Sequence, residues 1–447
     1  MRIVDLFQEA YAIFDVYIAN FVSGDALVYA MELAPFIAMF ELPLYLLIFL
    51  GVFKYYRRKA MTKPAMLTFS PSVTCIVTCY SEGKDVQTTI SSMANQIYPG
   101  HIEVLAMIDG AVANKPTYDA AQEMLPKVRR IANRSLRVIP KWLRGGRVSS
   151  ENTGLAIASG EIIMVLDGDT SFDNDMVANA VQHFQDPNVA AVSGNLRLRN
   201  VKDGLAAKLQ AIEYMMSIGT SKVGLSEFNI VNNVSGAFGI FRKSVMQHIG
   251  GWDSGTAEDL DLTLRLKKYF ARYPDMRIVF EYYALGHTDG PGTFKQFFQQ
   301  RHRWDGDLFY LYILKHAESL KPGLMGWRNF IALVWMGLFF QLVMPFIIVA
   351  YTLFLLVTAP LSSTLAVLLL VYIFYFVMSM AMYLIGVLLL SDRKKEDLKL
   401  IWCLPFIPIF TFATRCWSAF ASVDEIIRHI HLDSSMAPWW VLKRAKF

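Results

Sequence analysis

Charged residues and cysteines are both scarce in this chain. Of its 447 residues only 18% are charged and 54% are hydrophobic, which is too apolar for an ordinary soluble enzyme. The net charge of +5 is small for this length and gives no support to nucleic-acid binding. The chain has four cysteines that form neither a disulfide framework nor a metal-binding pattern, and we expect reduced, packed thiols at Cys75, Cys79, Cys403 and Cys416.

The hydrophobic excess is concentrated at the two ends of the chain. A middle region of roughly 270 residues has normal charge density, which predicts a soluble domain set between membrane segments. We expect an amphipathic N-terminal segment (1–30), a transmembrane helix (31–53), a soluble domain (64–290), interfacial helices (291–328), transmembrane and interfacial helices (329–427) and a basic tail (428–447). The chain would therefore cross a bilayer several times.

The first membrane segment predicts the orientation. Leu33–Phe53 has about the length that crosses a bilayer. Only Arg2 precedes it among basic residues, whereas Lys54, Arg57, Arg58, Lys59 and Lys63 follow it. The positive-inside bias places the N-terminus outside and residue 54 onwards in the cytoplasm. Glu41 inside this helix has two open interpretations, a bundle-facing carboxyl group and the lining of a hydrated path.

The later apolar runs predict a membrane hairpin and one segment whose course stays open. About Phe330–Val357 and Leu365–Leu390 are long enough to cross and return. Trp402–Val423 is apolar but contains two prolines, which suits an interfacial helix joined to a span, a kinked span or a re-entrant segment. Thr293–Lys315 is aromatic and basic together, and we place it on the membrane surface.

Strands and helices alternate between these membrane segments. Short apolar runs predict strands at Val73–Thr78, Glu103–Ile108, Leu136–Ile139, Ile162–Leu166, Val189–Ser193, Ala237–Phe241 and Arg277–Phe280. Periodic runs predict helices at Lys84–Gln96, Ser149–Ser159, about Asp203–Ile218 and Asp259–Phe270. This alternation predicts βαβ units and a largely parallel sheet, for which nucleotide binding is the default expectation.

Several acidic residues follow the ends of predicted strands. In Glu161–Asp169, EIIMVLDGD, a buried strand stops at Asp167 and Asp169, with a glycine between them that lets the backbone bend. Carboxylates at the carboxyl end of a parallel strand suit Mg²⁺ or Mn²⁺ with a diphosphate, although a solvated turn has the same pattern. Glu82 and Asp109 follow the first and second strands in the same way.

Four motifs occur in a set order, namely Asp109-Gly110, Asp167-Gly168-Asp169, Ala257-Glu258-Asp259 and Gln300-Arg301-His302-Arg303-Trp304. They resemble the D, DxD, TED and QxxRW set of processive family 2 glycosyltransferases, the membrane synthases of hyaluronan, chitin, cellulose and poly-N-acetylglucosamine. Further similar stretches are Tyr80-Ser81-Glu82, Gly145-Gly146-Arg147 and Gly236-Ala237-Phe238-Gly239. The resemblance covers about Pro71–Phe309. It implies an α/β GT-A fold, a Rossmann-like mixed sheet, joined to α-helical transmembrane and interfacial helices.

The resemblance also implies a role for each motif. Asp259, with Glu258 beside it, matches the catalytic base that takes the proton of the acceptor hydroxyl. Asp169, with help from Asp167, matches the ligands of Mg²⁺ or Mn²⁺. The positions that match nucleotide contacts are Tyr80, Glu82, Asp109, Arg147, Asp167, Gln300 and Arg303. The positions that match acceptor contacts are Gly236, Ala237, Phe238 and Trp304. For Trp304 an interfacial anchor is the alternative, and for Glu258 and Asp259 it is a helix start.

The activity that this resemblance implies is inverting, processive polymerisation of a β-linked extracellular polysaccharide from a UDP-sugar. UDP-GlcNAc and UDP-Glc are the favoured donors, the catalytic domain would face the cytoplasm at the plasma (inner) membrane, and the polymer would be translocated outward. Expected partners are the UDP-sugar, the growing polysaccharide and the bilayer, with room for an accessory export or regulatory subunit. The alternatives are a non-processive lipid-linked sugar transferase and a catalytically silent polysaccharide channel subunit.

Two positions depart from the family pattern. Ala257 stands where the TED motif has threonine, so that a hydroxyl contact is lost while the carboxylates remain. Arg147 stands where the usual residue is lysine. Arginine presents a planar fork of donors instead of a compact ammonium, so we expect the contacts at this position to differ in geometry.

Overall fold

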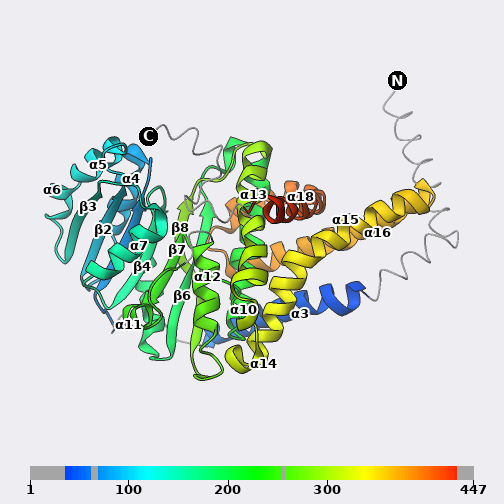
Figure 1. The fold of residues 1–447 in the computed structure, drawn as a ribbon, viewed down its shortest axis with the longest axis horizontal. Helices are drawn as coiled ribbons and strands as arrows, with labels where there is room; N and C mark the ends of the chain where they lie inside the picture. The colour runs from blue at the N-terminus through cyan, green and yellow to red at the C-terminus, as the bar shows by residue number, and fades with distance from the viewer. Residues whose placement is uncertain (1–35, 62–68, 254–256, 430–447) are drawn as a thin grey trace.

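The computed structural model describes residues 36–61, 69–253 and 257–429 of the chain. The predicted N-terminal amphipathic segment and nearly all of the basic tail lie outside these described residues. A soluble part built around one β-sheet occupies the left of Figure 1, and α3 (Leu42–Met61), α15 (Met344–Thr358) and α16 (Leu361–Ile385) extend from it to the right. This arrangement agrees with the uneven distribution of apolar residues along the chain.

An eight-stranded mixed sheet forms the centre of the soluble part, in the order β3-β2-β1-β4-β7-β6-β8-β5. The strands are β1 (Val73–Cys79), β2 (Ile102–Asp109), β3 (Arg134–Lys141), β4 (Ile162–Asp167), β5 (Ser171–Phe172), β6 (Val189–Leu198), β7 (Phe238–Arg242) and β8 (Arg277–Thr288). The strands β1 to β4 pair in parallel, as predicted. The expectation of a largely parallel sheet is wrong for the other half, where β7 runs antiparallel to both β4 and β6 and only β6 and β8 pair in parallel.

The last long strand extends well beyond its predicted end. Arg277–Phe280 was the apolar run that predicted it, but β8 continues to Thr288. Glu281 and His287 interrupt the apolar pattern in this continuation, and both have a partner from another element. Glu281 accepts from His183 at 2.6 Å, and His287 contacts Asp173 at 2.8 Å. Because these partners come from distant parts of the sequence, the hydrophobic pattern could not reveal the extension.

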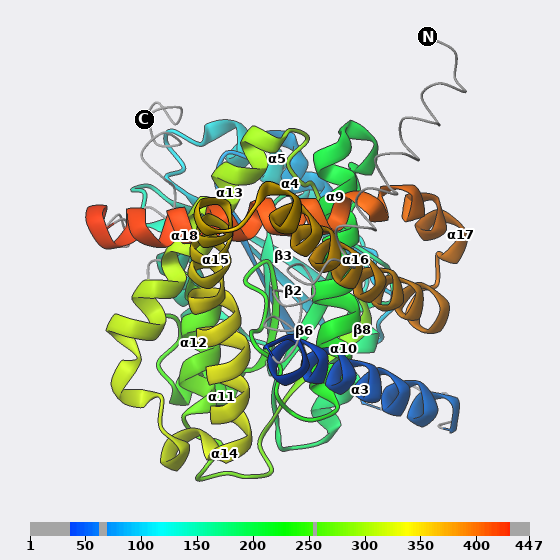
Figure 2. The same ribbon diagram turned by 90° about the vertical axis from the view of Figure 1, so that its right-hand side faces the viewer.

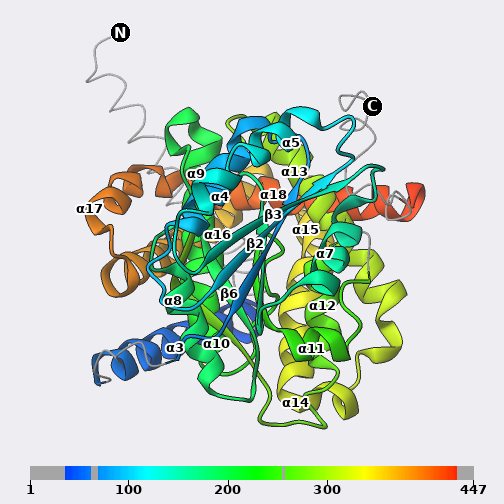
Figure 3. The ribbon, with the colours of Figure 1, turned by 90° about the vertical axis from the view of Figure 1, so that its left-hand side faces the viewer.

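Helices cover both faces of the sheet. They are α4 (Val86–Ala94), α5 (Lys115–Gln122), α6 (Leu125–Val128), α7 (Gly146–Ile157), α8 (Met176–Val181), α9 (Leu205–Tyr214), α10 (Ser221–Ser226), α11 (Lys243–His248), α12 (Glu258–Lys267) and α13 (Phe294–Phe309). Figure 3 shows α4 and α8 on one side and α7, α11 and α12 on the other. Alternate residues of β1 enter different cores, with Cys75 and Val77 on the side of α4 and Ile76 on the side of α12. Burial on both faces explains why β1, β2 and β4 are continuous apolar runs.

Four helices in the described part are long and apolar enough to cross a membrane, namely Ile37–Met61, Pro322–Thr358, Leu361–Leu390 and Lys394–Arg428. They contain, besides α3, α15 and α16, the helices α14 (Pro322–Ala332), α17 (Lys394–Asp397) and α18 (Ile407–Arg428). The 3₁₀-helical segment Leu398–Phe406 precedes α18, at the place where the prolines interrupt the predicted pattern. Figure 2 shows α18 crossing α15, and α18 also packs against α13.

The first of the four long apolar helices packs directly on the part of the structure built around the sheet. In Figure 2, α3 lies beneath α10. A Cβ atom added to Gly224 of α10 would lie 2.5 Å from the carbonyl oxygen of Ile48 in α3, so only glycine permits this approach. At the end of α3, Lys54 donates to the Glu227 carbonyl oxygen at 2.9 Å, and Arg58 pairs with the Glu227 carboxylate. The basic residues that follow the first span therefore contact the soluble domain itself.

Candidate active site

The acidic turn lies at the end of β4, where the sequence pattern placed it. The amide of Gly168 donates to the carbonyl oxygen of Thr78 at 3.1 Å, which brings the turn against the end of β1. A Cβ atom on Gly168 would lie 3.0 Å from that oxygen and 3.1 Å from Cδ of Glu82. Glycine is needed here because the turn lies directly over the Glu82 carboxyl group. Three acidic side chains, Glu82, Asp167 and Asp169, are thus gathered at one edge of the sheet.

The pKa values of two of these carboxyl groups are raised. Burial raises the pKa of Glu82 to about 7, and the nearby charges of Asp169 and Asp167 act in the same direction. Oε1 of Glu82 accepts from the Tyr80 amide at 2.7 Å, while Oε2 is buried without a hydrogen-bond partner in the described part of the chain. Burial and the charge of Asp167 raise the pKa of Asp169. Carboxylates that repel one another in a buried place are stabilised by a cation.

A divalent cation fits this donor set when a diphosphate completes it. Within the described ranges no group of three or more His, Cys, Asp or Glu residues could hold a metal by itself. Mg²⁺, however, usually takes one or two protein carboxylates and obtains its other ligands from substrate phosphates and water. Among described residues the Asp169 carboxylate accepts one side-chain bond, a long one of 3.4 Å from Thr170. Asp169 is therefore the carboxylate most available to a metal, and the oxygens of the acidic turn fit a hard cation.

Asp109 holds the glycine-rich loop that precedes α7. Its two carboxylate oxygens accept from the amides of Gly145 at 2.8 Å and Gly146 at 2.9 Å, and Lys141 pairs with it at 3.0 Å. Gly146 adopts a φ of +78°, which favours glycine at this position. The described contacts of Asp109 thus shape the loop that ends in Arg147, a role that its motif did not predict.

Arg147 connects the two halves of the site. Its guanidinium contacts Asp167 of β4 at 2.5 Å and Glu258 of α12 at 2.7 Å. It also pairs with Glu151 at 2.9 Å and donates to the carbonyl oxygen of Gly236 at 2.7 Å. A lysine ammonium is a single nitrogen and could not reach all of these oxygens. The departure from the family pattern therefore produces a network in which one side chain spans from the acidic turn to the predicted base.

The predicted catalytic base lies at the start of α12. Ala257, which precedes it, adopts a left-handed backbone with φ of +41°. Oδ2 of Asp259 accepts from the Gly236 amide at 3.1 Å and from Nδ2 of Asn233 at 3.3 Å. Glu258 is buried, and burial raises the pKa of its carboxyl group while Arg147 opposes this shift. Of the three predicted acceptor-side loop residues, Gly236 contacts Asp259, whereas Phe238 is buried in β7.

The QRHRW motif lies on α13, and its side chains make long-range contacts. Oε1 of Gln300 accepts from Gln210 of α9 at 2.8 Å. Arg301 pairs with Glu213 at 2.6 Å and covers the ring of Trp304 at 4.9 Å. Trp304 packs against the core on the α4 side of the sheet, and His302 contacts Asp424 of α18 at 2.8 Å. Arg303 lies partly exposed on the same helix. The motif therefore joins α13 to α9 and to the last membrane helix.

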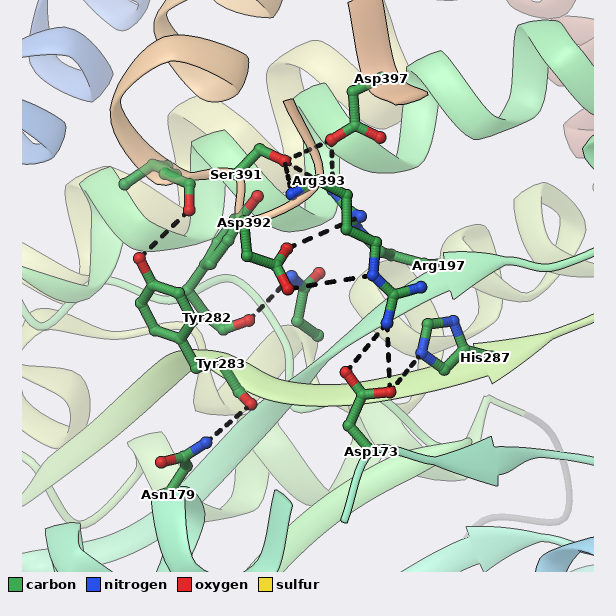
Figure 4. Close-up of polar contacts among 12 residues, drawn as sticks. Asp173, Asn179, Arg197, Tyr282, Tyr283, His287, Ser391, Asp392, Arg393 and Asp397 are labelled. Atoms are coloured by element: carbon green, nitrogen blue, oxygen red, sulfur yellow. Dashed lines mark hydrogen bonds and ion pairs between the residues drawn. The ribbon is translucent and has the colours of Figure 1, made fainter. Parts of the chain in front are cut away.

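An ion-pair cluster ties the strand after the acidic turn to the turn between α16 and α17. Asp173 contacts His287 of β8 at 2.8 Å and Arg393 at 3.2 Å (Figure 4). The hydrogen bond from His287 and the charge of Arg393 lower the pKa of Asp173. Nearby, Arg197 pairs with Asp397 at 2.6 Å. The segment that follows Asp169 is therefore held by the turn between two of the long apolar helices.

Sequence reasoning missed three residues that the structure brings to the site. Asn233 contacts the predicted base, Glu151 contacts Arg147, and the buried Lys222 donates to the carbonyl oxygen of the same Asn233. None of them belongs to a motif. A lysine among the small and apolar residues of Ser221–Ser226 was the one available signal, because a charge on an apolar face is unusual. His287 and His302 each contact an aspartate of another element.

The mixed sheet, the acidic turn and the helix-borne carboxylates define a glycosyltransferase of the GT-A class. A model of the family described as Glycosyl transferase family group 2 matches residues 162–390, about half of the chain, and the chain belongs to this family. The predicted GT-A fold and the predicted enzyme class are thereby confirmed. The TM-score to the mannosyltransferase PcManGT from Pyrobaculum calidifontis, solved in complex with GDP-Man and Mn²⁺, is 0.52. That match covers 86% of this chain and 97% of the other at 18% identity, and it shows the fold alone.

Curated relatives indicate the kind of glycosyltransferase to which the chain is similar. The poly-beta-1,6-N-acetyl-D-glucosamine synthase of Staphylococcus epidermidis is 31% identical over 234 residues, which are 52% of this chain and 53% of that protein. The synthase of the same name from Staphylococcus aureus strain COL is 30% identical over 233 residues, again 52% of this chain and 53% of that protein. The chain spans about half the length of the curated relatives it matches. Relationship to polysaccharide synthases, together with the four apolar helices, supports membrane association.

Proposed function

We propose that the protein is an inverting, processive glycosyltransferase that polymerises a β-linked extracellular polysaccharide from a UDP-sugar and moves it across the membrane. UDP-GlcNAc is the first donor to test, because the curated relatives are named as N-acetylglucosamine polymer synthases. UDP-Glc is the second. The observation on which the proposal rests is the bridge made by Arg147, which contacts Asp167 of the acidic turn and Glu258 beside the predicted base. Donor-side and acceptor-side carboxylates are thus held together by one side chain.

The residues have separate tasks in this mechanism. Asp259 is positioned by Asn233 and the Gly236 amide, and it takes the proton of the acceptor hydroxyl as that oxygen attacks the anomeric carbon. Asp169 and Asp167 would hold Mg²⁺ or Mn²⁺, which neutralises the charge of the departing UDP. Attack from the side opposite the leaving group inverts the anomeric configuration.

The remaining motif residues bind donor and acceptor in the proposal. Tyr80, Glu82 and Asp109 border the edge of the sheet at which the nucleotide would lie. Gln300 and Arg303 on α13 approach the diphosphate, and Trp304 offers an aromatic surface to the acceptor sugar. The Arg144 guanidinium lies 4.2 Å from the centroid of the Tyr80 ring. Together the two side chains offer an aromatic and cationic contact to the nucleobase of the donor.

We place the catalytic domain on the cytoplasmic side of the plasma (inner) membrane. The support is that Lys54 and Arg58, whose charges favour the cytoplasm, contact Glu227 of the soluble part. The catalytic domain would then lie on the side where nucleotide sugars are available. Lys84 is an exposed residue of the soluble part, and the accessibility of the new cysteine in a Lys84→Cys variant measures this orientation in sealed inverted vesicles.

Release of UDP by the purified full-length protein tests the enzyme proposal. With UDP-GlcNAc or UDP-Glc and Mn²⁺ or Mg²⁺, we expect turnover that chelation abolishes and added metal restores. Asp259→Asn should lower it by at least about 100-fold, since a general base contributes about 10²–10⁴-fold. Asp119→Asn is the matched control, because Asp119 is an exposed carboxylate paired with Lys115 on α5. Wild-type turnover no greater than that of Asp259→Asn with any UDP-sugar would support a silent channel subunit instead.

The length of the product tests processivity. We expect a ladder or a high-molecular-weight polymer on a gel when labelled donor is in excess. A glycolipid that carries a single sugar as the sole product would exclude processive polymerisation and support the lipid-linked transferase. Recovery of polymer inside sealed inverted vesicles, protected from an added glycosidase, would measure translocation.

A further inference from the structure

Lys222 is a buried ammonium close to the predicted base. It lies on α10, only 4% exposed, and its Nζ donates to the carbonyl oxygen of Asn233 at 3.0 Å. The side-chain amide of the same Asn233 donates to Oδ2 of Asp259 at 3.3 Å. One residue of the loop thus links the lysine and the base. An ammonium has three N–H groups to donate, and this is its one hydrogen bond among the described residues.

The burial of Lys222 has no structural explanation in the form of an ion pair. No carboxylate in the described ranges lies within 4.0 Å of its Nζ. Burial lowers its pKa to about 8, and the charge of Asp259 opposes this shift. Buried charges without a close partner destabilise a fold, and they are retained mainly where function requires them.

The position of α10 is set by the first membrane helix. Gly224, two residues after Lys222, meets Ile48 of α3 so closely that no larger side chain fits. Charged groups on the elements packed against α10 are engaged away from Lys222. Lys54 and Arg58 of α3 contact Glu227, while Glu281 of β8 contacts His183. Asp259 is therefore the charged group with which Lys222 interacts.

We propose that Lys222 is a positioning residue for the reaction, which holds the Asn233 loop and places a positive charge beside Asp259. This inference rests on the proposed role of Asp259 as the base. The ammonium fixes the Asn233 carbonyl, so that the amide of this residue faces the base. The other titratable groups that interact with Asp259 are Glu258 and Tyr312.

Lys222→Met tests the proposal with a side chain of similar length and no charge. In the UDP-release assay, we expect kcat to fall at least tenfold while the KM for the donor stays within twofold. The wild-type pH profile should have an alkaline limb near pH 8, where Lys222 loses its proton, and this limb should disappear in the variant. The Tm should stay level or rise, because a buried charge is removed.

Two further variants make the result decisive. Asn233→Ala should lower kcat in the same direction, because the amide that holds Asp259 is lost. Lys243→Met is the matched control. Like Lys222, Lys243 donates to a backbone carbonyl oxygen, that of Ala158 at 2.7 Å. It is half-buried and follows β7, at the opposite end of β4 from the acidic turn. Its kcat and pH profile should equal those of the wild type.

The outcomes that overturn the proposal are distinct from those that overturn the enzyme function. Wild-type kcat and an unchanged pH profile in Lys222→Met would overturn the role of Lys222 and leave the base assignment intact. A fall in kcat that accompanies a fall in Tm, with the alkaline limb of the profile unmoved, would show a merely structural role. No turnover by the wild type with any donor would overturn both.

Discussion

Replacing Arg147 with lysine separates the shape of the guanidinium from its charge. The side chain is 20% exposed and contacts three carboxylates and one carbonyl oxygen at 2.5–2.9 Å. A lysine nitrogen keeps the charge but reaches at most part of this set, so we expect two contacts to be lost. A hydrogen bond to a charged group contributes about 1.5–3 kcal/mol. Because Asp167 is 29% exposed and solvent compensates in part, we expect a loss of about 3 kcal/mol in the free energy of unfolding.

Thermal unfolding of the detergent-solubilised full-length protein measures this loss. A change of 1 kcal/mol shifts the Tm of a domain of this size by about 2–4 °C, so the Tm of Arg147→Lys should fall by about 6–12 °C. Arg137→Lys is the control, because Arg137 is 46% exposed and pairs with Glu103 at 3.3 Å. Exposed pairs contribute about 0.2–1 kcal/mol, and its Tm should move by no more than about 4 °C. Equal Tm shifts in the two variants would refute the idea that the several contacts of the Arg147 guanidinium stabilise the site.

Two other substitutions test the supports of the site. Asp261→Asn should destabilise the protein by about 3–5 kcal/mol in thermal unfolding at pH 7, because the buried carboxylate contacts Lys315 and His316 at 2.8 Å. Burial opposes the charge of Asp261, but these partners lower the pKa of its carboxyl group. The difference in free energy of unfolding between wild type and variant should therefore shrink as pH falls below about 4 and persist above it. Gly224→Ala should lower the Tm by several degrees, whereas Gly323→Ala, with open space around it, should not; equal effects would contradict the close helix contact.

The joint between the acidic turn and the membrane helices gives the site a second kind of support. Asp173 follows Asp169 by one short strand and is held by Arg393, which lies between two apolar helices. On the other side of the sheet, α10 rests on α3. The segment after Asp169 and the helix that bears Lys222 are therefore each supported by an apolar helix or by the turn beside one. This arrangement suits the proposed function, in which sugar transfer and passage of the polymer take place in one protein.

The sequence by itself determined the order of the motifs, the first four strands and the place of the acidic turn. These features are local. A buried strand is a continuous apolar run, and its carboxyl end follows from where that run stops, as at Asp167. The apolar runs likewise indicated the membrane helices, because a bilayer requires a minimum length of nonpolar chain. Asp259 was assigned from the resemblance to the TED motif of family 2 glycosyltransferases, since no local property distinguishes it from a helix-start residue.

Only the tertiary structure decided which charges meet. Arg147 and Glu258 are more than 100 residues apart, as are Asp173 and His287, and pairing at such distances depends on how whole elements pack. The same holds for the polar half of β8, whose partners stabilise it where its own sequence is not apolar. Lys222 is the clearest case. Its local sequence shows a lysine in a small apolar helix, and only the packing of α10 against α3 and the Asn233 loop links it through Asn233 to Asp259.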